Sequence, residues 1–465
     1  MKKLIIFCFC INSIFVFAQP TLQVDERTEL MSVVFRLAGA QEYCDNYVES
    51  YVADIDSFFV LYREHPVVEY SQLLRQNFAI GYDAVMSMAV HLTIENNEVR
   101  LQDGISPCDI DFRWQCDSIP KYIALLNDFY RKTEFHRFFT QHKDLYAHTE
   151  NAFRENVFSN IKFEWFDKFY GKNADGGFNV IISLSNGISN YGPHVKYDNG
   201  KEEYFAIIGT WGTDSLGYPT YGRGVGSFVT HEFNHSFCNR LIDEYLPDLL
   251  PKAEVFNDLV IDKMIATGYG HADTYLYELL VRACVIRYGV YNLGEGADVD
   301  YWVAQQRHQG FLWIEHLNEA LSRYELNRDK YPTLRSFMPE IVKVQNGLDP
   351  LEIYKQVIEN QPIILGANIK NGAQDVNSNL DRIIINFDKP MIIGFNGSSS
   401  GKCQNCEFPE VIDAEWNKET KKEWILIVEL KPNTSYSMSF PAAFFFSEEG
   451  AYNPKETYYL DFKTK

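Results

Sequence analysis

The chain has 465 residues, with 63 acidic and 43 basic side chains and a net charge of −20. Such an acidic surface disfavours nucleic acids and anionic membranes as partners. The length exceeds one ordinary hydrophobic core, so two or three domains are expected, and a hydrophobic share of 46% excludes wholesale disorder.

The first residues have the features of an export signal. Lys2 and Lys3 form a positive end, an apolar run follows over residues 4–17, and short side chains precede Ala18. We expect cleavage after Ala18 and an exported protein, periplasmic or extracellular. No later run reaches the roughly 18 apolar residues that span a bilayer, so no membrane insertion is expected.

Export makes disulfides possible. Cys108 and Cys116 bracket a short polar loop and are expected to pair in an oxidising compartment. Cys403 and Cys406 are either a loop disulfide or half of a metal knuckle, and the disulfide is favoured because zinc knuckles need four ligands. Two of the nine cysteines lie in the signal, so the remainder is odd and at least one thiol stays free.

Residues 19–170 form the first region, which we expect to be rich in helices. Apolar and aromatic residues recur at three- and four-residue spacing over 67–92 and 121–153. Residues 171–360 follow as a mixed core. Branched and aromatic residues at 178–185 and 202–211 predict strands, and helical spacing resumes from 224 to about 359. The fold class is therefore α+β.

Residues 361–465 have a different pattern. Short strands are predicted at 382–391, 423–430, 434–440 and 457–463, and glycine, proline and asparagine turns separate them. About 100 residues of this kind are typical of a β-sandwich.

The stretch VTHEFNH, residues 229–235, carries the main functional signal. On a helix, His231 and His235 are four residues apart and point the same way, so their ring nitrogens can converge on one Zn²⁺ ion. Glu232 can then act as a general base toward a metal-bound water. Besides the histidines it is the only acidic or basic residue between Val225 and Asn239, and a lone carboxylate is costly to bury. The alternatives are a chance match and a hydrogen-bonded cluster on a core helix.

A catalytic zinc usually has three protein ligands and a water. Cys238 and Leu241 stand where a longer pattern would place glycine and a third histidine, so we expect an acid from farther along the chain. The candidates are Glu244, Asp248, Glu254, Asp258 and Glu278. We favour Glu278, the only acid in the middle of an apolar helical segment over 271–289. The alternative is an ordinary helix pair between Glu278 and Arg282.

Other residues are expected to support this centre. Arg282 and Asn239 are candidates for hydrogen bonds that orient the ligands. Tyr275 and His271 are candidate donors to an oxyanion. The strand at 202–211, if it forms a sheet edge, offers backbone pairing to an extended peptide. We expect a buried thiol at Cys238 and a loop position for His194.

Two resemblances follow from these motifs. The run from Thr230 to His235, followed by Glu278-Leu-Leu-Val-Arg282-Ala283, resembles gluzincin metallopeptidases. That resemblance implies a zincin-like core over 171–360, with His231, His235 and Glu278 as zinc ligands and Glu232 as the base. Residues 21–349, including RTELMSVVFRLAG, resemble an exported bacterial family of unknown function.

The C-terminal motifs NGAQDV, IIINFDKPM and LKPNTSYSM resemble bacterial Ig-like domains, which implies spacing or docking to a surface or glycan. We therefore expect an exported zinc metallopeptidase, a hydrolase that acts on peptides or proteins. The alternative is a non-catalytic exported binding or adhesion protein with a structural or degenerate zincin core.

Overall fold

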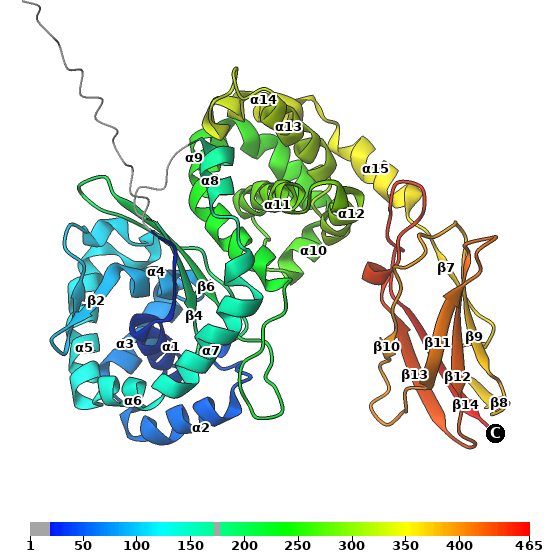
Figure 1. Ribbon diagram of the computed structural model, residues 1–465, viewed down its shortest axis with the longest axis horizontal. Helices are drawn as coiled ribbons and strands as arrows, with labels where there is room; N and C mark the ends of the chain where they lie inside the picture. The colour runs from blue at the N-terminus through cyan, green and yellow to red at the C-terminus, as the bar shows by residue number, and fades with distance from the viewer. Residues whose placement is uncertain (1–18, 172–176) are drawn as a thin grey trace, which may run out of the picture. The chain divides into compact units, whose positions relative to one another are not determined.

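The computed structural model describes residues 19–171 and 177–465, so the expected signal with Lys2, Lys3 and cleavage after Ala18 lies outside the described residues. The chain is a mixed α+β protein with several small sheets (Figure 1). It divides into two compact units, one ending at Phe237 and one running from Cys238 to Lys465. The division falls inside one continuous helix, α9 (Val225–Leu259).

The sheet of the first unit has the strand order β1-β4-β6-β5. The three strands β1, β4 and β6 are parallel, and β5 is antiparallel to β6 at the edge. Their bounds are Thr21–Val24, Phe178–Ile182, Glu202–Ile208 and His194–Lys196 for β1, β4, β6 and β5. The central strands β4 and β6 are buried along almost their whole length, as is usual for parallel strands covered on both faces.

One open possibility about this sheet is excluded, and one expectation was wrong. The predicted strand at 202–211 is not an edge, because β6 pairs with β4 on one side and with β5 on the other. His194 is not a loop residue, because it begins the edge strand β5. A local pattern predicts a strand but says nothing about its neighbours in the sheet. Strand β5 has only three residues, which is too short a stretch for an alternating pattern to be recognised.

The helices of the first unit are α1 (Glu26–Leu37), α2 (Glu49–Phe58), α3 (Pro66–Phe78), α4 (Asp83–His91), α5 (Ile119–Lys132), α6 (Phe135–Gln141), α7 (Lys143–Asn156) and α8 (Glu164–Tyr170). Helices occupy both predicted stretches, but each stretch is divided. Ala79 and Tyr82 adopt φ angles of 53° and 48° between α3 and α4, and Glu134 adopts 52° between α5 and α6. A hairpin of β2 (Leu92–Glu95) and β3 (Glu98–Leu101) follows α4.

A buried carboxylate ties α1 to the end of β4. Glu29 is fully buried, and its oxygens accept hydrogen bonds from the hydroxyls of Ser183 at 2.8 Å, Ser185 at 2.6 Å and Tyr51 at 2.9 Å. They also accept the backbone N–H of Leu184 at 2.9 Å. Four donors offset the cost of removing this carboxylate from water.

The second unit begins with the remainder of α9 and continues through α10 (Ile261–Ala266), α11 (Ala272–Leu293), α12 (Val299–Gln309), α13 (Ile314–Leu326), α14 (Leu334–Gly347) and α15 (Pro350–Asn360). Local signals set several of these starts. Asp298 caps α12 by accepting the Tyr301 N–H, and Asp349 caps α15, which has Pro350 in its first turn. Among the described residues, no helix is both long and apolar enough to cross a membrane.

Residues 364–464 form two four-stranded sheets, with orders β11-β12-β9-β7 and β10-β13-β14-β8. The four predicted strands are present as β9 (Arg382–Phe387), β12 (Glu423–Glu429), β13 (Ser435–Phe440) and β14 (Tyr458–Thr464). Sequence patterns did not predict the other four, which are β7 (Ile364–Ala367), β8 (Ala373–Val376), β10 (Ser399–Ser400) and β11 (Glu410–Trp416).

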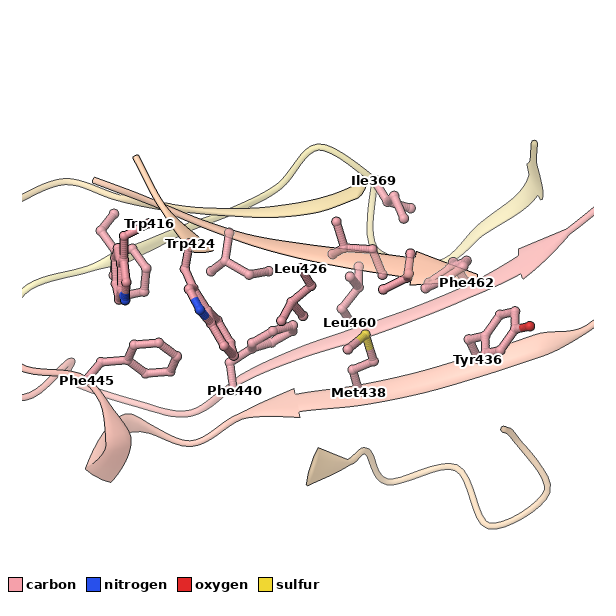
Figure 2. Packing of buried hydrophobic residues seen from close by; sticks show 14 of the residues in the cluster. Ile369, Trp416, Trp424, Leu426, Tyr436, Met438, Phe440, Phe445, Leu460 and Phe462 are labelled. Atoms are coloured by element: carbon pink, nitrogen blue, oxygen red, sulfur yellow. The ribbon is translucent and has the colours of Figure 1, made fainter. Parts of the chain in front are cut away.

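The two sheets pack face to face over one core, as Figure 2 shows. Alternate residues of β12, such as Trp424 and Leu426, meet Met438 and Phe440 of β13 and Leu460 of β14. This alternation is the period-two pattern of a two-layer sandwich. Both expected disulfides are formed, Cys108–Cys116 and Cys403–Cys406, and the free cysteines of the described chain are Cys44, Cys238 and Cys284.

We predict that Glu29→Ala lowers the free energy of unfolding by about 3–5 kcal/mol, because three hydroxyls and one backbone N–H lose their acceptor inside the core. Urea unfolding measures this change. Glu49→Ala, which removes an exposed glutamate from the first turn of α2, serves as the control and should change stability by no more than about 0.5 kcal/mol. Equal effects of the two substitutions would contradict the role assigned to Glu29.

We also predict a pH dependence, because burial raises the pKa of Glu29 above its ordinary value of 4.5. As the pH rises above 4.5, the unfolded chain releases this proton before the folded chain does, so folding loses free energy. Glu29→Gln cannot titrate. The stability of the parent relative to Glu29→Gln should therefore be greatest below pH 4.5 and should fall as the pH rises toward neutral in a series of urea titrations. A rise over the same range would refute the assignment.

Candidate metal centre

The two histidines lie on the first turns of α9, which begins at Val225 within a segment, residues 222–226, that contains three glycines. His231 and His235 are half-buried, and their Nε2 atoms are 3.1 Å apart. Two nitrogens bound to one tetrahedral zinc at about 2.0–2.1 Å would be separated by roughly 3.3 Å. The observed separation also matches a hydrogen bond between imidazoles, so a third donor is needed to distinguish the two arrangements.

That third donor is Glu278 of α11. The ligand atoms offered by His231, His235 and Glu278 all lie within 4.8 Å of one another. Two imidazoles and one carboxylate form the donor set of His₂Glu zinc sites, and three protein ligands leave a position for water. The residues present therefore fit a zinc ion. The other candidate acids, Glu244, Asp248, Glu254 and Asp258, are exposed on α9, and Glu244 pairs with Arg335.

Aromatic packing holds the opposite face of α9 on the sheet. Phe233 contacts Phe178 of β4, with ring centroids 4.9 Å apart, and Phe237 contacts Tyr204 of β6 at 4.7 Å. These phenylalanines are four residues apart, like the histidines, but two residues out of phase with them. Packing them on the sheet therefore turns the histidines away from it.

A polar contact inside this packing was not predicted from the sequence. Asn234, the second variable residue of the motif, is fully buried, and its side-chain oxygen accepts the Tyr170 hydroxyl at 2.7 Å. The Tyr170 ring stacks on Phe237 at 4.3 Å. One signal for this contact exists in the sequence, because an asparagine within the apolar stretch of a helix must find a partner when it is buried.

A close backbone approach also fixes the motif. Gly192 lies against the turn of Glu232, and a Cβ atom at position 192 would lie 2.0 Å from the Glu232 carbonyl oxygen. Only glycine permits this contact without movement of the backbone. The Ser236 hydroxyl donates to the Gly192 carbonyl at 3.4 Å. Glu232 itself is 6% exposed.

The Glu278 carboxylate is held by Arg282. The Arg282 Nε donates to Glu278 at 3.1 Å, and Nη1 donates to the side-chain oxygens of Gln306 at 2.8 Å and Gln309 at 2.7 Å, both on α12. The guanidinium also lies 4.6 Å from the centre of the Phe311 ring. The expected Glu278–Arg282 pair is therefore present, but it belongs to a larger network that orients the carboxylate.

The structure places three further candidates and one cysteine as follows. Tyr275 is fully buried with its ring on Phe311, so its hydroxyl is enclosed in the core, and we assign it no oxyanion role. His271 is exposed at the start of α11, and Asn239 is half-buried on α9. Cys238 is a buried thiol, with its Sγ 3.8 Å from that of Cys284.

Comparisons with known proteins place the chain in a family. A family model described as a domain of unknown function, DUF4932, matches residues 20–344. The chain belongs to the DUF4932 family. No curated protein matches this DUF4932 chain.

Among solved structures, domains 1–6 of the surface layer protein SbsC are 14% identical, over 53% of this chain and 34% of that one, with a TM-score of 0.17. The N-terminal part of the same bacterial S-layer protein is 12% identical, over 55% and 60%, with the same score. The DUF4932 chain thus spans about a third of the longer S-layer fragment, and scores this low carry no argument about its fold.

We predict that Gly192→Ala lowers the free energy of unfolding by about 1–3 kcal/mol, because the added methyl group forces the backbone away from the turn of Glu232. Chemical denaturation measures the loss. Gly222→Ala is the matched control, since nothing lies within 4 Å of a Cβ there. If both variants were as stable as the parent, the proposal that the close approach of Gly192 to Glu232 contributes to stability would be contradicted.

Proposed function

We propose that this DUF4932 protein is an exported zinc-dependent peptidase of the gluzincin type. The observation that carries the proposal is the convergence of ligand atoms from His231, His235 and Glu278 within 4.8 Å. Three features add support: the His-Glu-x-x-His spacing on a helix, the arginine that orients the carboxylate, and the single acid among residues 225–239.

His231, His235 and Glu278 would hold the ion. When bound, zinc would polarise the scissile carbonyl and make a water molecule acidic near neutral pH. Glu232 follows His231 directly and accepts the proton of the attacking water, then delivers it to the leaving amine.

The peptide would bind along the edge of the sheet in the first unit. A substrate in extended form can add to an exposed strand through backbone hydrogen bonds. Strand β6 is internal, so the edge strand β5 takes the role that we first considered for 202–211. The proposed zincin-like core, residues 171–360, combines this sheet with the helices that carry the ligands.

We propose further that residues 361–465 are an Ig-like domain. If β8 is set apart as an extra strand that pairs parallel with the last strand, β14, and the others are labelled A to G in chain order, the sheets have the orders A-B-E-D and C-F-G of immunoglobulin domains. The hydroxyl of Tyr436, at the start of β13, accepts the backbone N–H of Lys431 at 2.7 Å. This contact spans the turn between β12 and β13 and has the position of the tyrosine corner in such domains.

Export is part of the same proposal. The N-terminal segment has the charge and apolar pattern of a secretion signal, and two disulfides are formed in the folded chain. Disulfides of this kind persist in oxidising compartments. A peptide or protein substrate outside the cytoplasm is consistent with both features.

We predict that Glu232→Gln keeps zinc at one ion per chain but lowers the rate of peptide hydrolysis by about 10²–10⁴-fold, because the base is lost and the ligands are retained. His231→Ala should lose both zinc and activity. Elemental analysis of protein purified without chelator measures the metal, and release of fragments from an unfolded protein substrate measures the rate.

Glu244→Gln is the control, since this acid lies on the same helix but is exposed and paired with Arg335. It should keep both zinc and activity. Absence of zinc from the parent protein would overturn the proposed metal centre. Undiminished cleavage by Glu232→Gln would overturn only the assignment of the base.

A further inference from the structure

Two opposite faces of helix α12 make different contacts. Gln306 and Gln309 reach Arg282 from one side of the helix. Tyr301, Ala304 and Arg307 contact the β-sandwich from the other. At 100° per residue, the mean directions of these two sets are about 170° apart. Helix α12 therefore lies between the Arg282 side chain, which bonds to Glu278, and the C-terminal sandwich.

The sandwich side of α12 is built from directional contacts. Arg307 is 7% exposed, and its Nη2 donates to the backbone carbonyls of Gly450 at 2.6 Å and Ala451 at 3.2 Å. Its guanidinium lies 4.1 Å from the centre of the Tyr452 ring. Arg307 Nη1 also donates to the Glu315 carboxylate of α13 at 3.2 Å. The two carbonyls still set position and orientation together, because moving the loop would remove both acceptors of Nη2 and leave this nearly buried charge with Glu315 alone.

Aromatic stacking adds a second attachment. The Tyr301 ring lies parallel to Phe395, with centroids 4.4 Å apart, and meets the edge of Phe446 at 4.9 Å. Ala304, Phe446 and Ala451 form a small buried cluster beside these rings. A domain that served only as a spacer would need no such buried contact with a helix more than 50 residues earlier in the chain.

We propose that the sandwich is a positioning element for the third metal ligand. It holds α12 through Arg307 and Tyr301; α12 holds Arg282 through Gln306 and Gln309; and Arg282 orients the Glu278 carboxylate. Arg307 and Gln306 are thus positioning residues that act through others. The consequence for metal binding rests on the proposed function, whereas the mechanical connection from the sandwich to α11 does not.

The first test measures the zinc dissociation constant of the full chain by competition with a chromophoric chelator. Partners of metal ligands typically contribute 10–100-fold to affinity, so contacts one step farther away should contribute less. We expect Arg307→Met and Gln306→Ala each to weaken zinc binding about 3–10-fold. The double variant should lose less than the product of the two, because both act on one path.

The matched control is Lys431→Met, which removes an exposed cation paired with Glu407 on the sandwich surface. It should leave the zinc dissociation constant unchanged. If Arg307→Met fails to fold, Tyr301→Leu removes the stacking and keeps apolar bulk at the same contact. Zinc binding within twofold of the parent in the folded variants would overturn the proposal.

The second test needs no metal. Hydrogen exchange of the metal-free full chain reports on α11, where peptides covering residues 278–286 should exchange several-fold faster in Arg307→Met than in the parent and Lys431→Met. Strands β13 and β14 should stay protected in all three. If the parent binds no zinc, the proposed function fails, and this test alone decides the connection. Unchanged hydrogen exchange in α11 would refute the mechanical connection between the sandwich and α11.

Discussion

The candidate metal centre depends on how helix α9 packs on the sheet of the first unit. Phe233 and Phe237 bury one face of the helix against Phe178 and Tyr204, and this contact fixes the rotation of the helix about its axis. The histidines, two residues out of phase with the phenylalanines, must then face away from the sheet. A helix rotated by one residue would lose the aromatic packing and would aim both imidazoles elsewhere.

Polar groups that are buried or half-buried provide the other fixed points, and each joins segments distant in sequence. Glu29 joins α1 to the residues after β4, Arg282 joins α11 to α12, and Arg307 joins α12 to the sandwich. Such groups are costly to bury, so they are retained only with their partners in place. These groups specify one arrangement of the segments that they join, because a hydrogen bond weakens steeply when its geometry is lost.

The sandwich shows which strands a sequence pattern can predict and which it cannot. Strands β13 and β14 alternate apolar and polar residues, because one side of each faces the shared core. Strands β9 and β12 are short runs of branched and aromatic residues in which only the burial alternates, and both kinds of pattern predict a strand. Strand β11 was missed because most of its residues are exposed, and β10 because it has only two residues. Edge strands of this kind owe their form to a neighbour's hydrogen bonds, which leave no pattern in their own side chains.

The sequence alone determined the α+β class, the main helical stretches, four strands of the sandwich and both disulfide pairs, because each depends on local periodicity or on short spacing. It also pointed to His231 and His235, whose separation on one helix is local. Only the tertiary structure decided that Glu278, and not an acid of α9, offers a ligand atom near them. It alone revealed Gly192 against Glu232, Tyr170 on Asn234 and the glutamines behind Arg282. These contacts join residues that are distant in the chain, and no local pattern records which distant surfaces meet.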